Sequence, residues 1–499
     1  MIAAAAAAAL LLAPAAAAAP VVHEAHALEG PAGARSPPVV PTEAVLRWQL
    51  NDTGCFVHYN MATMAGLQGC QDGVTAPPAL AAWQPTALDT DAWVSTCKAM
   101  GGTRMIYVAK HGCGFAAWKS KTTYNYSVTQ APDQIDVVAA FVKSARAAGL
   151  GVGFYYSDAT NSYCHVSGGV VQPGKIVPGR QIAVTQAEYD AIVLAHLAEL
   201  WGNYGALDEL WFDGGYYPPL KAPLTDLITK LQPNAVVLGG YGLAPSTARW
   251  VGTESGLAPY PSWSRTSCTW NEPPKCKTAA EAGRGSPDGA FWCPAETDFT
   301  LQRRDQWFYN GQSGVHPPAE LRLMYEQSAG SNTGLIIDIA PYPNGSVPAE
   351  QVAAAAALGK FKRGCYGGTP VASSSGAGTI KPSQSGGASV DRVQVREDLA
   401  NGQNVRNFTL VAKLANGGGS AVPLCPDRGG SSIGSKYICV LKAPIKVESL
   451  TLTVTAAVGG GSIEAAKITQ FAAFSCDALA REIDAEWAAS AFANQHGPE

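Results

Sequence analysis

Acidic and imidazole side chains directly follow short apolar segments in this chain. Asp213 follows E-L-W-F and precedes two glycines, while His58 follows C-F-V and His111 follows I-Y-V-A-K. A carboxylate at the end of an apolar strand is costly unless it is hydrogen-bonded or used in chemistry, so Asp213 is a candidate reactive group. Taken singly, Asp213 is equally compatible with a helix cap or a turn, and each histidine with a core or loop role.

A carboxyl pair is the requirement for glycoside hydrolysis, and a retaining enzyme holds the two groups about 5–5.5 Å apart. Glu254, in the glycine-flanked segment V-G-T-E-S-G, is one candidate partner for Asp213. Glu296, in W-C-P-A-E-T-D, is its rival. Spacing along the chain places neither of them relative to Asp213, so both remain candidates.

Aromatic side chains accompany the histidines. Tyr155 and Tyr156 end the run L-G-V-G-F-Y-Y, and Trp118 follows His111 in A-K-H-G-C-G-F-A-A-W. Neutral imidazoles donate hydrogen bonds to sugar hydroxyls, and aromatic faces pack against the C–H faces of sugars. The gathering of these residue types at the ends of several apolar runs favours a sugar site over a set of unrelated structural roles.

Helical patterns alternate with the apolar runs from about residue 47 to residue 341. Helices are expected at 89–100, 135–148 and 185–204, each ended by a glycine, and strands at 54–58, 105–109, 151–156, 209–212, 235–239 and 335–339. Alternation over this length predicts a parallel (β/α) barrel, whose functional residues occupy the carboxyl ends of the strands. A doubly wound nucleotide-binding sheet is the alternative, but its glycine-rich phosphate motifs are absent from the sequence.

Changes in composition predict how the chain is divided. The alanine-rich apolar run 1–20 ends in small residues and is typical of a signal peptide. The barrel is assigned to 45–365, a Gly/Ser-rich linker to 366–390 and an antiparallel β-sandwich, where apolar residues alternate, to 391–476. Residues 477–499 are expected to form a tail, either helical or loose.

Charge and cysteine content narrow the possible partners and location. The 499 residues carry 35 Lys+Arg and 39 Asp+Glu, a net charge of -4, so no basic field for nucleic acid or an anionic membrane is expected. Twelve dispersed cysteines without a C-x-x-C pair favour disulfides in an oxidising compartment. Cys365 and the three sandwich cysteines make an even four, leaving eight for the barrel.

Other motifs agree with secretion and indicate no cofactor. The N-x-[ST] sequons lie at Asn51, Asn125, Asn344 and Asn407. The sequence contains neither H-E-x-x-H nor a calcium-loop pattern, so no metal or other cofactor is expected. A secreted, extracellular or lysosome-like location follows as the prediction.

Several ordered blocks resemble one known family. They are A-K-H-G-C-G-F-A-A-W-K-S-K-T-T-Y, L-G-V-G-F-Y-Y-S, E-L-W-F-D-G and S-A-G-S-N-T-G-L-I-I-D-I-A-P-Y-P-N-G. In this order they resemble the signature blocks of the α-L-fucosidases of glycoside hydrolase family 29, over about residues 45–365. D-R-V-Q-V-R-E-D-L-A-N-G-Q and S-S-I-G-S-K-Y-I extend the resemblance into the C-terminal part, which is similar to the galactose-binding-like jelly roll of that family.

The resemblance implies a retaining exo-fucosidase on a (β/α)8-like barrel, acting on terminal α-linked fucose of oligosaccharides or glycoconjugates by double displacement. It maps the nucleophile onto Asp213 and favours Glu254 over Glu296 as the acid/base. The expected substrate-binding residues are His58, His111, Trp118, Tyr155 and Tyr156.

Three departures from the family pattern leave other functions open. Gly112 stands where the family has a second histidine, F-V-H-Y replaces F-x-H-W, and Gln68-Gly69 replaces E-W. Each change could remove a sugar contact, so the alternatives are a weakly active or inactive fucose-binding homologue, or a hydrolase of another 6-deoxy or galacto-configured sugar. Retention of a carboxyl pair favours the hydrolase, because binding alone needs no such pair.

Overall fold

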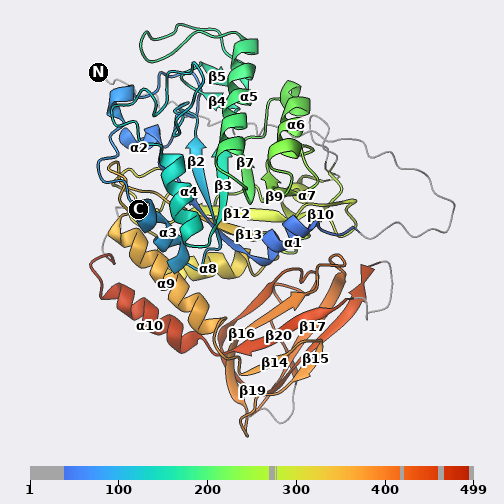
Figure 1. The fold of residues 1–499 in the computed structure, drawn as a ribbon. Coiled ribbons are helices and arrows are strands. Elements are labelled where there is room, and N and C mark those ends of the chain that lie inside the picture. The colour runs from blue at the N-terminus through green and yellow to red at the C-terminus, as the bar shows by residue number, and fades with distance from the viewer. Residues whose placement is uncertain (1–38, 269–275, 277, 416–420, 459–465, 494–499) are drawn as a thin grey trace, which may run out of the picture.

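Eight parallel strands close into a barrel in the N-terminal part of the molecule (Figure 1). The computed structural model describes residues 39–268, 276, 278–415, 421–458 and 466–493, so the predicted signal peptide lies outside the described residues. Around the barrel the strand order is β1-β13-β12-β9-β8-β7-β3-β2. The bounds are β1 Thr53–Val57, β2 Arg104–Lys110, β3 Gly151–Tyr156, β7 Glu209–Phe212, β8 Val236–Leu238, β9 Thr247–Trp250, β12 Ala295–Thr300 and β13 Gly334–Ile339. The predicted (β/α) barrel is confirmed.

Helices link most of the strands. They are α1 Glu43–Leu50, α2 Met61–Met64, α3 Thr90–Ala99, α4 Val137–Ala147, α5 Gln186–Asn203, α6 Lys221–Leu231, α7 Ala279–Arg284, α8 Pro318–Ser328, α9 Ala349–Cys365 and α10 Asp477–Ala488, with 3-10 turns η1 Leu80–Ala82 and η2 Pro218–Leu220. The predicted helices are α3, α4 and α5. The glycines that follow them, Gly101, Gly149 and Gly205, have φ of 81°, 73° and 77°, the left-handed conformation that ends a helix.

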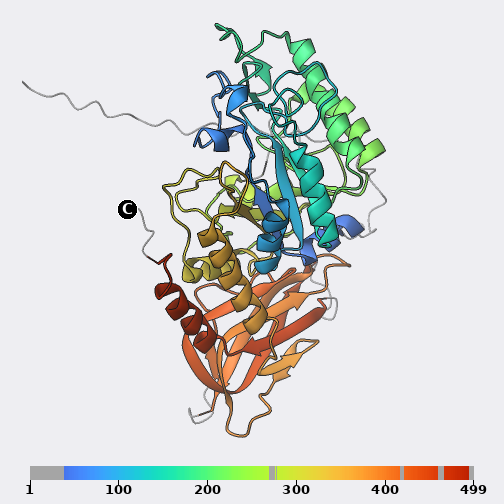
Figure 2. The ribbon, with the colours of Figure 1, turned by 60° about the vertical axis from the view of Figure 1, so that its left-hand side comes forward.

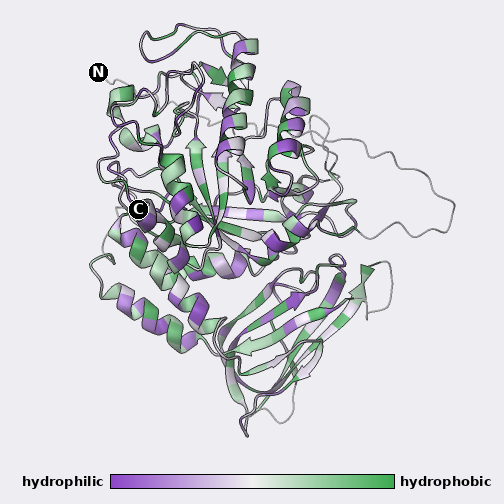
Figure 3. Ribbon diagram, in the orientation of Figure 1, coloured by the Kyte–Doolittle hydropathy of each residue, from purple (hydrophilic) through white to green (hydrophobic). Residues whose placement is uncertain are grey.

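Two barrel strands, β9 and β12, were not predicted as strands. Both carry polar side chains that point into the protein: Arg249 in β9, and Glu296 and Asp298 in β12, are all buried. These residues interrupt the apolar run that marks a strand, and β12 is paler than β2 and β3 when coloured by hydropathy (Figure 3). Two small antiparallel sheets lie outside the barrel. One has three strands, β4 Thr160–Asn161, β5 Val166–Ser167 and β6 Val170–Val171, and the other has two, β10 Arg265–Thr266 and β11 Phe291–Trp292.

The C-terminal part is a seven-stranded antiparallel sheet domain with its own core (Figure 2). Its strands are β14 Ala372–Ser374, β15 Gly378–Ile380, β16 Ala388–Glu397, β17 Val405–Leu414, β18 Ala421–Pro423, β19 Tyr437–Ala457 and β20 Ile468–Phe474. The long β19 pairs with β16 through its first half and with β17 through its second half.

The segment predicted as a linker, 366–390, is part of this sheet domain, which corrects that prediction. β14 pairs with β20, and β15 pairs with β19. The composition resembles a linker because these strands are largely exposed, and in them only Ala372 and Ile380 are buried. The predicted tail begins with α10, which packs against α8 and α9.

The described residues contain five disulfides. They are Cys55–Cys97, Cys70–Cys113, Cys268–Cys276, Cys365–Cys476 and Cys425–Cys439. The four C-terminal cysteines therefore pair among themselves as the count allowed, and Cys365–Cys476 ties α9 of the barrel to the start of α10. The eight barrel cysteines give three disulfides, with Cys164 and Cys293 as buried thiols.

A buried ion cluster fills the amino-terminal end of the barrel. The Arg104 Nε donates to Glu209 Oε2 at 2.8 Å, and its Nη2 donates to Glu296 Oε1. The indole N–H of Trp48 also donates to Glu209, at 2.7 Å. All three side chains are at most 5% exposed. Burial and the neighbouring Glu209 charge raise the pKa of Glu296 well above its usual value, so Arg104 neutralises the charge that this buried pair of carboxyl groups carries.

Replacing Arg104 by methionine is expected to lower the free energy of unfolding by about 3–5 kcal/mol, because the buried pair Glu209 and Glu296 loses its counter-charge. Urea unfolding followed by circular dichroism measures the loss. The matched control is Arg481→Met, which breaks an exposed pair with Asp477 and should cost less than about 1 kcal/mol. Equal effects of the two substitutions would contradict this account of the cluster.

Candidate active site

A pocket opens at the carboxyl ends of the barrel strands. Its lining residues are Phe56, His58, Gln71, His111, Tyr155, Trp211, Asp213, Glu254, Asp298 and Trp307. The structure therefore brings together five of the seven residues expected from the sequence, contributed by segments up to about 200 positions apart. Parallel strands produce this convergence, because all their carboxyl ends meet at the same end of the barrel.

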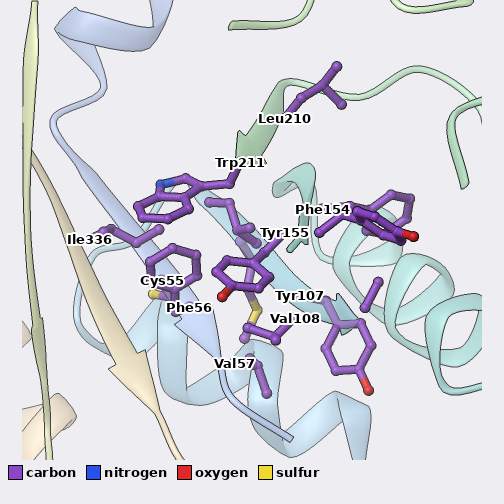
Figure 4. Close-up of a cluster of buried hydrophobic side chains, with 14 of the residues drawn as sticks. Cys55, Phe56, Val57, Tyr107, Val108, Phe154, Tyr155, Leu210, Trp211 and Ile336 are labelled. Carbon is purple, nitrogen blue, oxygen red and sulfur yellow. The ribbon is translucent and has the colours of Figure 1, made fainter. Parts of the chain in front are cut away.

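The two-residue period of the strands selects the side chains that reach the pocket. Tyr155 and Trp211 stack with ring centroids 5.5 Å apart, and Phe56 meets Trp211 edge-on at 5.2 Å. Figure 4 shows these three rings turned toward one another, whereas Phe154 and Leu210, one residue away on the same strands, point elsewhere. Phe56 and Trp211 were missed in the sequence, although each lies two residues before a predicted site residue.

Asp213 follows β7 and is held by a phenol. The Tyr155 hydroxyl donates to Asp213 Oδ2 at 2.6 Å. Burial and the neighbouring Asp213 charge raise the pKa of Tyr155 well above its usual value, so this donor keeps its proton. Gly214 and Gly215 follow with φ of 70° and 85°, which turns the chain and leaves the Asp213 carboxylate exposed to the pocket.

Glu254 lies in the loop after β9, on the open side of the same pocket. The Trp307 indole donates to Glu254 Oε2 at 3.0 Å. Burial, aided by the negative charge of Asp213, raises the pKa of Glu254 above its usual value, and the Trp307 hydrogen bond opposes that rise. A carboxyl group with raised proton affinity beside an exposed carboxylate is suited to donating a proton.

Asp298 is a third carboxyl group in the pocket, and sequence reasoning missed it together with its strand β12. The Trp250 indole donates to Asp298 Oδ1 at 2.9 Å. Burial, with the charges of Glu254 and Asp213, raises the pKa of Asp298 well above its usual value. The sequence offered one signal for Asp298, which is that an acidic residue stands two positions after Glu296.

Glu296, the rival acid/base candidate, lies below the pocket and does not line it. Arg104 holds one of its oxygens, and the Trp211 indole donates to the other at 3.4 Å. It therefore supports the pocket floor through Trp211. The two acidic residues of β12 point to the same side because of the strand period, and only Asp298 is far enough along the strand to reach the pocket.

The two predicted histidines face the pocket in different electrostatic settings. His58 Nδ1 is 2.7 Å from Asp338 Oδ1, which also accepts from the His58 backbone N–H, so the ring donates from Nδ1 and presents Nε2 to the pocket. His111 stacks on Tyr155 with centroids 5.6 Å apart. Burial, together with the electrostatic influence of His58 and Lys110, lowers the pKa of His111 well below its usual value, so its imidazole is neutral.

Trp118 and Tyr156 do not reach the pocket, contrary to expectation. The Trp118 indole donates to Glu199 Oε2 at 2.9 Å, and the Tyr156 hydroxyl is 3.2 Å from His196 Nδ1. Glu199 and His196 both belong to α5, on the outside of the barrel. Tyr156 is directed there because it alternates with Tyr155 along β3.

The glycines that depart from the family pattern are explained by a disulfide. Cys70–Cys113 draws the loop after α2 onto the loop after β2, so that a Cβ on Gly112 would lie 2.7 Å from the Cys70 carbonyl oxygen. A Cβ on Gly69 would lie 2.7 Å from His111 Cε1. Larger side chains at these two positions are therefore incompatible with the local packing.

Carboxyl groups, imidazoles and aromatic rings at the carboxyl ends of an eight-stranded parallel barrel are typical of the (β/α)-barrel glycoside hydrolases. The chain belongs to the alpha-L-fucosidase family, whose model, described as Alpha-L-fucosidase, matches residues 54–364. The fold and the family resemblance expected from the sequence are thereby confirmed.

Individual relatives agree with the family assignment. A protein of Oryza sativa subsp. japonica assigned as alpha-L-fucosidase 1 is 31% identical, over 66% of this chain and 60% of its own length. Alpha-L-fucosidase 1 of Arabidopsis thaliana is 29% identical, over 63% and 58%. This chain thus spans about three fifths of the length of these curated relatives. A crystal structure from Bacteroides thetaiotaomicron, assigned as an alpha-L-fucosidase, is 27% identical with a TM-score of 0.76, covering 88% of this chain and 99% of that one.

Within the part of the chain that the structure describes, no group of three or more His, Cys, Asp or Glu side chains is placed to hold a metal ion. In the same residues, every helix is too short or too polar to cross a membrane.

Proposed function

We propose that this protein is a retaining exo-α-L-fucosidase that removes terminal α-linked fucose from oligosaccharides or glycoconjugates. The observation that carries the proposal is the pairing of Asp213 and Glu254 in one pocket, each held by a different aromatic donor. Tyr155 and Trp307 orient the two carboxyl groups, and burial together with the Asp213 charge raises the pKa of Glu254. Two carboxyl groups with separate roles are what double displacement requires.

In the first step Asp213 attacks the anomeric carbon while Glu254 protonates the departing glycosidic oxygen. The bond to the leaving group breaks as the ester bond to Asp213 forms. In the second step Glu254, now ionised, takes a proton from water, and the resulting nucleophile displaces Asp213 from the anomeric carbon. Two inversions return the sugar with its original configuration.

The other pocket residues serve binding in this proposal. His58 and neutral His111 offer hydrogen bonds to sugar hydroxyls, and Tyr155 positions the nucleophile. Trp211 and Trp307 supply flat apolar surface for the C–H faces of the sugar. Asp298 lies in the same pocket and accepts from the Trp250 indole, and its raised pKa favours the protonated form of this carboxyl group.

Secretion is part of the proposal. The five disulfides support maturation in an oxidising compartment. The four sequon asparagines, at positions 51, 125, 344 and 407, are all exposed, which is the condition for glycosylation.

The test is incubation of the purified protein with an aryl α-L-fucoside and a panel of fucosylated oligosaccharides. Release of fucose, with the α anomer seen first by NMR, is the expected result. Binding of fucose without release would favour the lectin-like homologue. Release of a different sugar from a matched panel of aryl glycosides would favour a hydrolase of another 6-deoxy or galacto-configured substrate.

Replacing Trp307 by phenylalanine is expected to move the basic limb of the kcat/KM profile to higher pH. The indole N–H stabilises ionised Glu254, so its removal raises the pKa of Glu254 further and keeps the acid protonated at higher pH. The profile is measured with an aryl α-L-fucoside. In the control Trp118→Phe, which removes an indole–carboxylate bond outside the pocket, the limb should stay in place. A downward shift in Trp307→Phe would contradict the proposed role of Glu254.

A further inference from the structure

The loop that follows α2 is attached to two other loops at the pocket. Cys70 is bonded to Cys113, two residues after His111, and the Gln68 amide donates to the Asp305 carbonyl oxygen. Beyond it, Asp72 Oδ1 accepts from the backbone N–H groups of Val74 and Thr75, each at 3.0 Å. Gln71 lies between these attachments. The backbone is therefore held on both sides of Gln71, which positions this residue at the pocket.

Gln71 and His111 lie on the same wall of the pocket. A Cβ on Gly69 would lie 2.7 Å from His111 Cε1 and 3.4 Å from Gln71 Cγ, so the two side chains flank this glycine. The close approach depends on the absence of a side chain at Gly69, whose φ is 143°.

Both side chains of this wall have unused hydrogen-bonding capacity. Among the described residues, the exposed Gln71 carboxamide has no protein partner, and the buried His111 Nδ1 has none either. Buried polar atoms are nearly always paired in folded proteins, so an unpaired nitrogen beside a free carboxamide in a pocket points to a polar ligand. A carboxamide both donates and accepts, which matches a hydroxyl group.

We propose that Gln71 is a specificity-determining residue whose carboxamide hydrogen-bonds one ring hydroxyl of the bound sugar, and that the Cys70–Cys113 disulfide positions it. This inference rests on the proposed function. The partner is a hydroxyl of the fucose ring rather than of the leaving group, because the Gln71 wall adjoins His111, which stacks on the tyrosine that holds Asp213. Glu254, which faces the leaving group, is held by Trp307 instead.

The experiment compares an aryl α-L-fucoside with its 2-, 3- and 4-deoxy analogues. For the wild type, each missing hydroxyl should lower kcat/KM. Gln71→Met keeps the length of the side chain but removes its hydrogen bond, and should lower kcat/KM on the parent substrate by about tenfold. On one deoxy analogue, and on that one alone, the variant and the wild type should have equal kcat/KM, because the contact is already missing. A structural defect would instead lower activity on all four substrates by the same factor.

The disulfide is tested in the same series. In Cys70→Ala/Cys113→Ala, the wild-type discrimination against that analogue should shrink, with most of the loss in KM. The double variant Cys425→Ala/Cys439→Ala removes a disulfide of the C-terminal domain and should keep full discrimination. Gln84→Met, at an exposed glutamine outside the pocket, is the control for the glutamine substitution.

The outcomes separate this inference from the proposed function. If the wild type releases no fucose from the parent substrate, the proposed function fails. If the wild type is active and Gln71→Met discriminates among the four substrates as the wild type does, the inference about Gln71 is overturned while the proposed function stands. Gln71→Met decides the question even if the cysteine variants fail to fold, and unchanged discrimination in a folded Cys70→Ala/Cys113→Ala protein would overturn the role of the disulfide.

Discussion

The Asp213→Asn variant is expected to lose fucoside hydrolysis by more than about 10⁴-fold in kcat, the scale seen when an enzyme loses its nucleophile. The amide keeps the shape and the contact with Tyr155 but cannot form the glycosyl ester. Turnover of an aryl α-L-fucoside measures the loss. Asp226→Asn, at an exposed aspartate of α6, is the matched control and should retain full activity.

Azide identifies Asp213 as the nucleophile by the configuration of the product. In Asp213→Gly, azide can enter the space left by the carboxylate and displace the leaving group once. A single displacement inverts the anomeric centre, so β-L-fucosyl azide is expected. Formation of the α anomer, or near wild-type hydrolysis in Asp213→Asn, would show that another group is the nucleophile.

The Glu254→Gln variant is expected to lose about 10²–10⁴-fold in kcat/KM on oligosaccharides, since a sugar alkoxide leaves poorly without a proton. The loss should be much smaller on an aryl fucoside with an acidic phenol, which departs without protonation. Michaelis–Menten kinetics over a series of leaving groups measures this dependence. With the acidic phenol and azide, Glu254→Ala should give the α-azide, because azide meets the glycosyl-enzyme after one inversion has already occurred.

Glu296→Gln provides the contrasting control. Glu296 forms an ion pair with Arg104 below the pocket, so Glu296→Gln should lower the midpoint of thermal unfolding. Its effect on kcat/KM should be the same for all leaving groups. If Glu296→Gln showed the leaving-group dependence and Glu254→Gln did not, the assignment of the acid/base would be reversed. The same kinetics applied to Asp298→Asn would show whether this third carboxyl group shares the proton transfer.

Local patterns in the sequence were sufficient for most of the barrel. Apolar runs ended by polar residues marked six of its eight strands, and glycines with positive φ marked the ends of three helices. The pattern failed at β9 and β12, because Arg249, Glu296 and Asp298 are buried polar residues paired through contacts distant in sequence. The pattern of hydrophobicity along the chain does not show which distant residues pair with these side chains.

The C-terminal part shows a related limit. Gly/Ser-rich composition predicted a linker at 366–390, whereas β14 and β15 pair with β20 and β19 there. Exposed strands bury few side chains, so their composition carries little strand signal. Pairing to strands about 70–100 residues away, rather than local propensity, orders this segment.

By itself, the sequence determined the barrel, the family and the residue types at the strand ends, because apolar periodicity and ordered motifs are local properties. Only the tertiary structure selected Tyr155 over Tyr156, placed Glu254 in the pocket with Glu296 beneath it, turned Trp118 toward α5, and added Asp298 and Gln71. These outcomes depend on which side of a strand faces the barrel axis and on which distant loops a disulfide joins. Both are set by closure of the barrel, and spacing along the chain does not encode them.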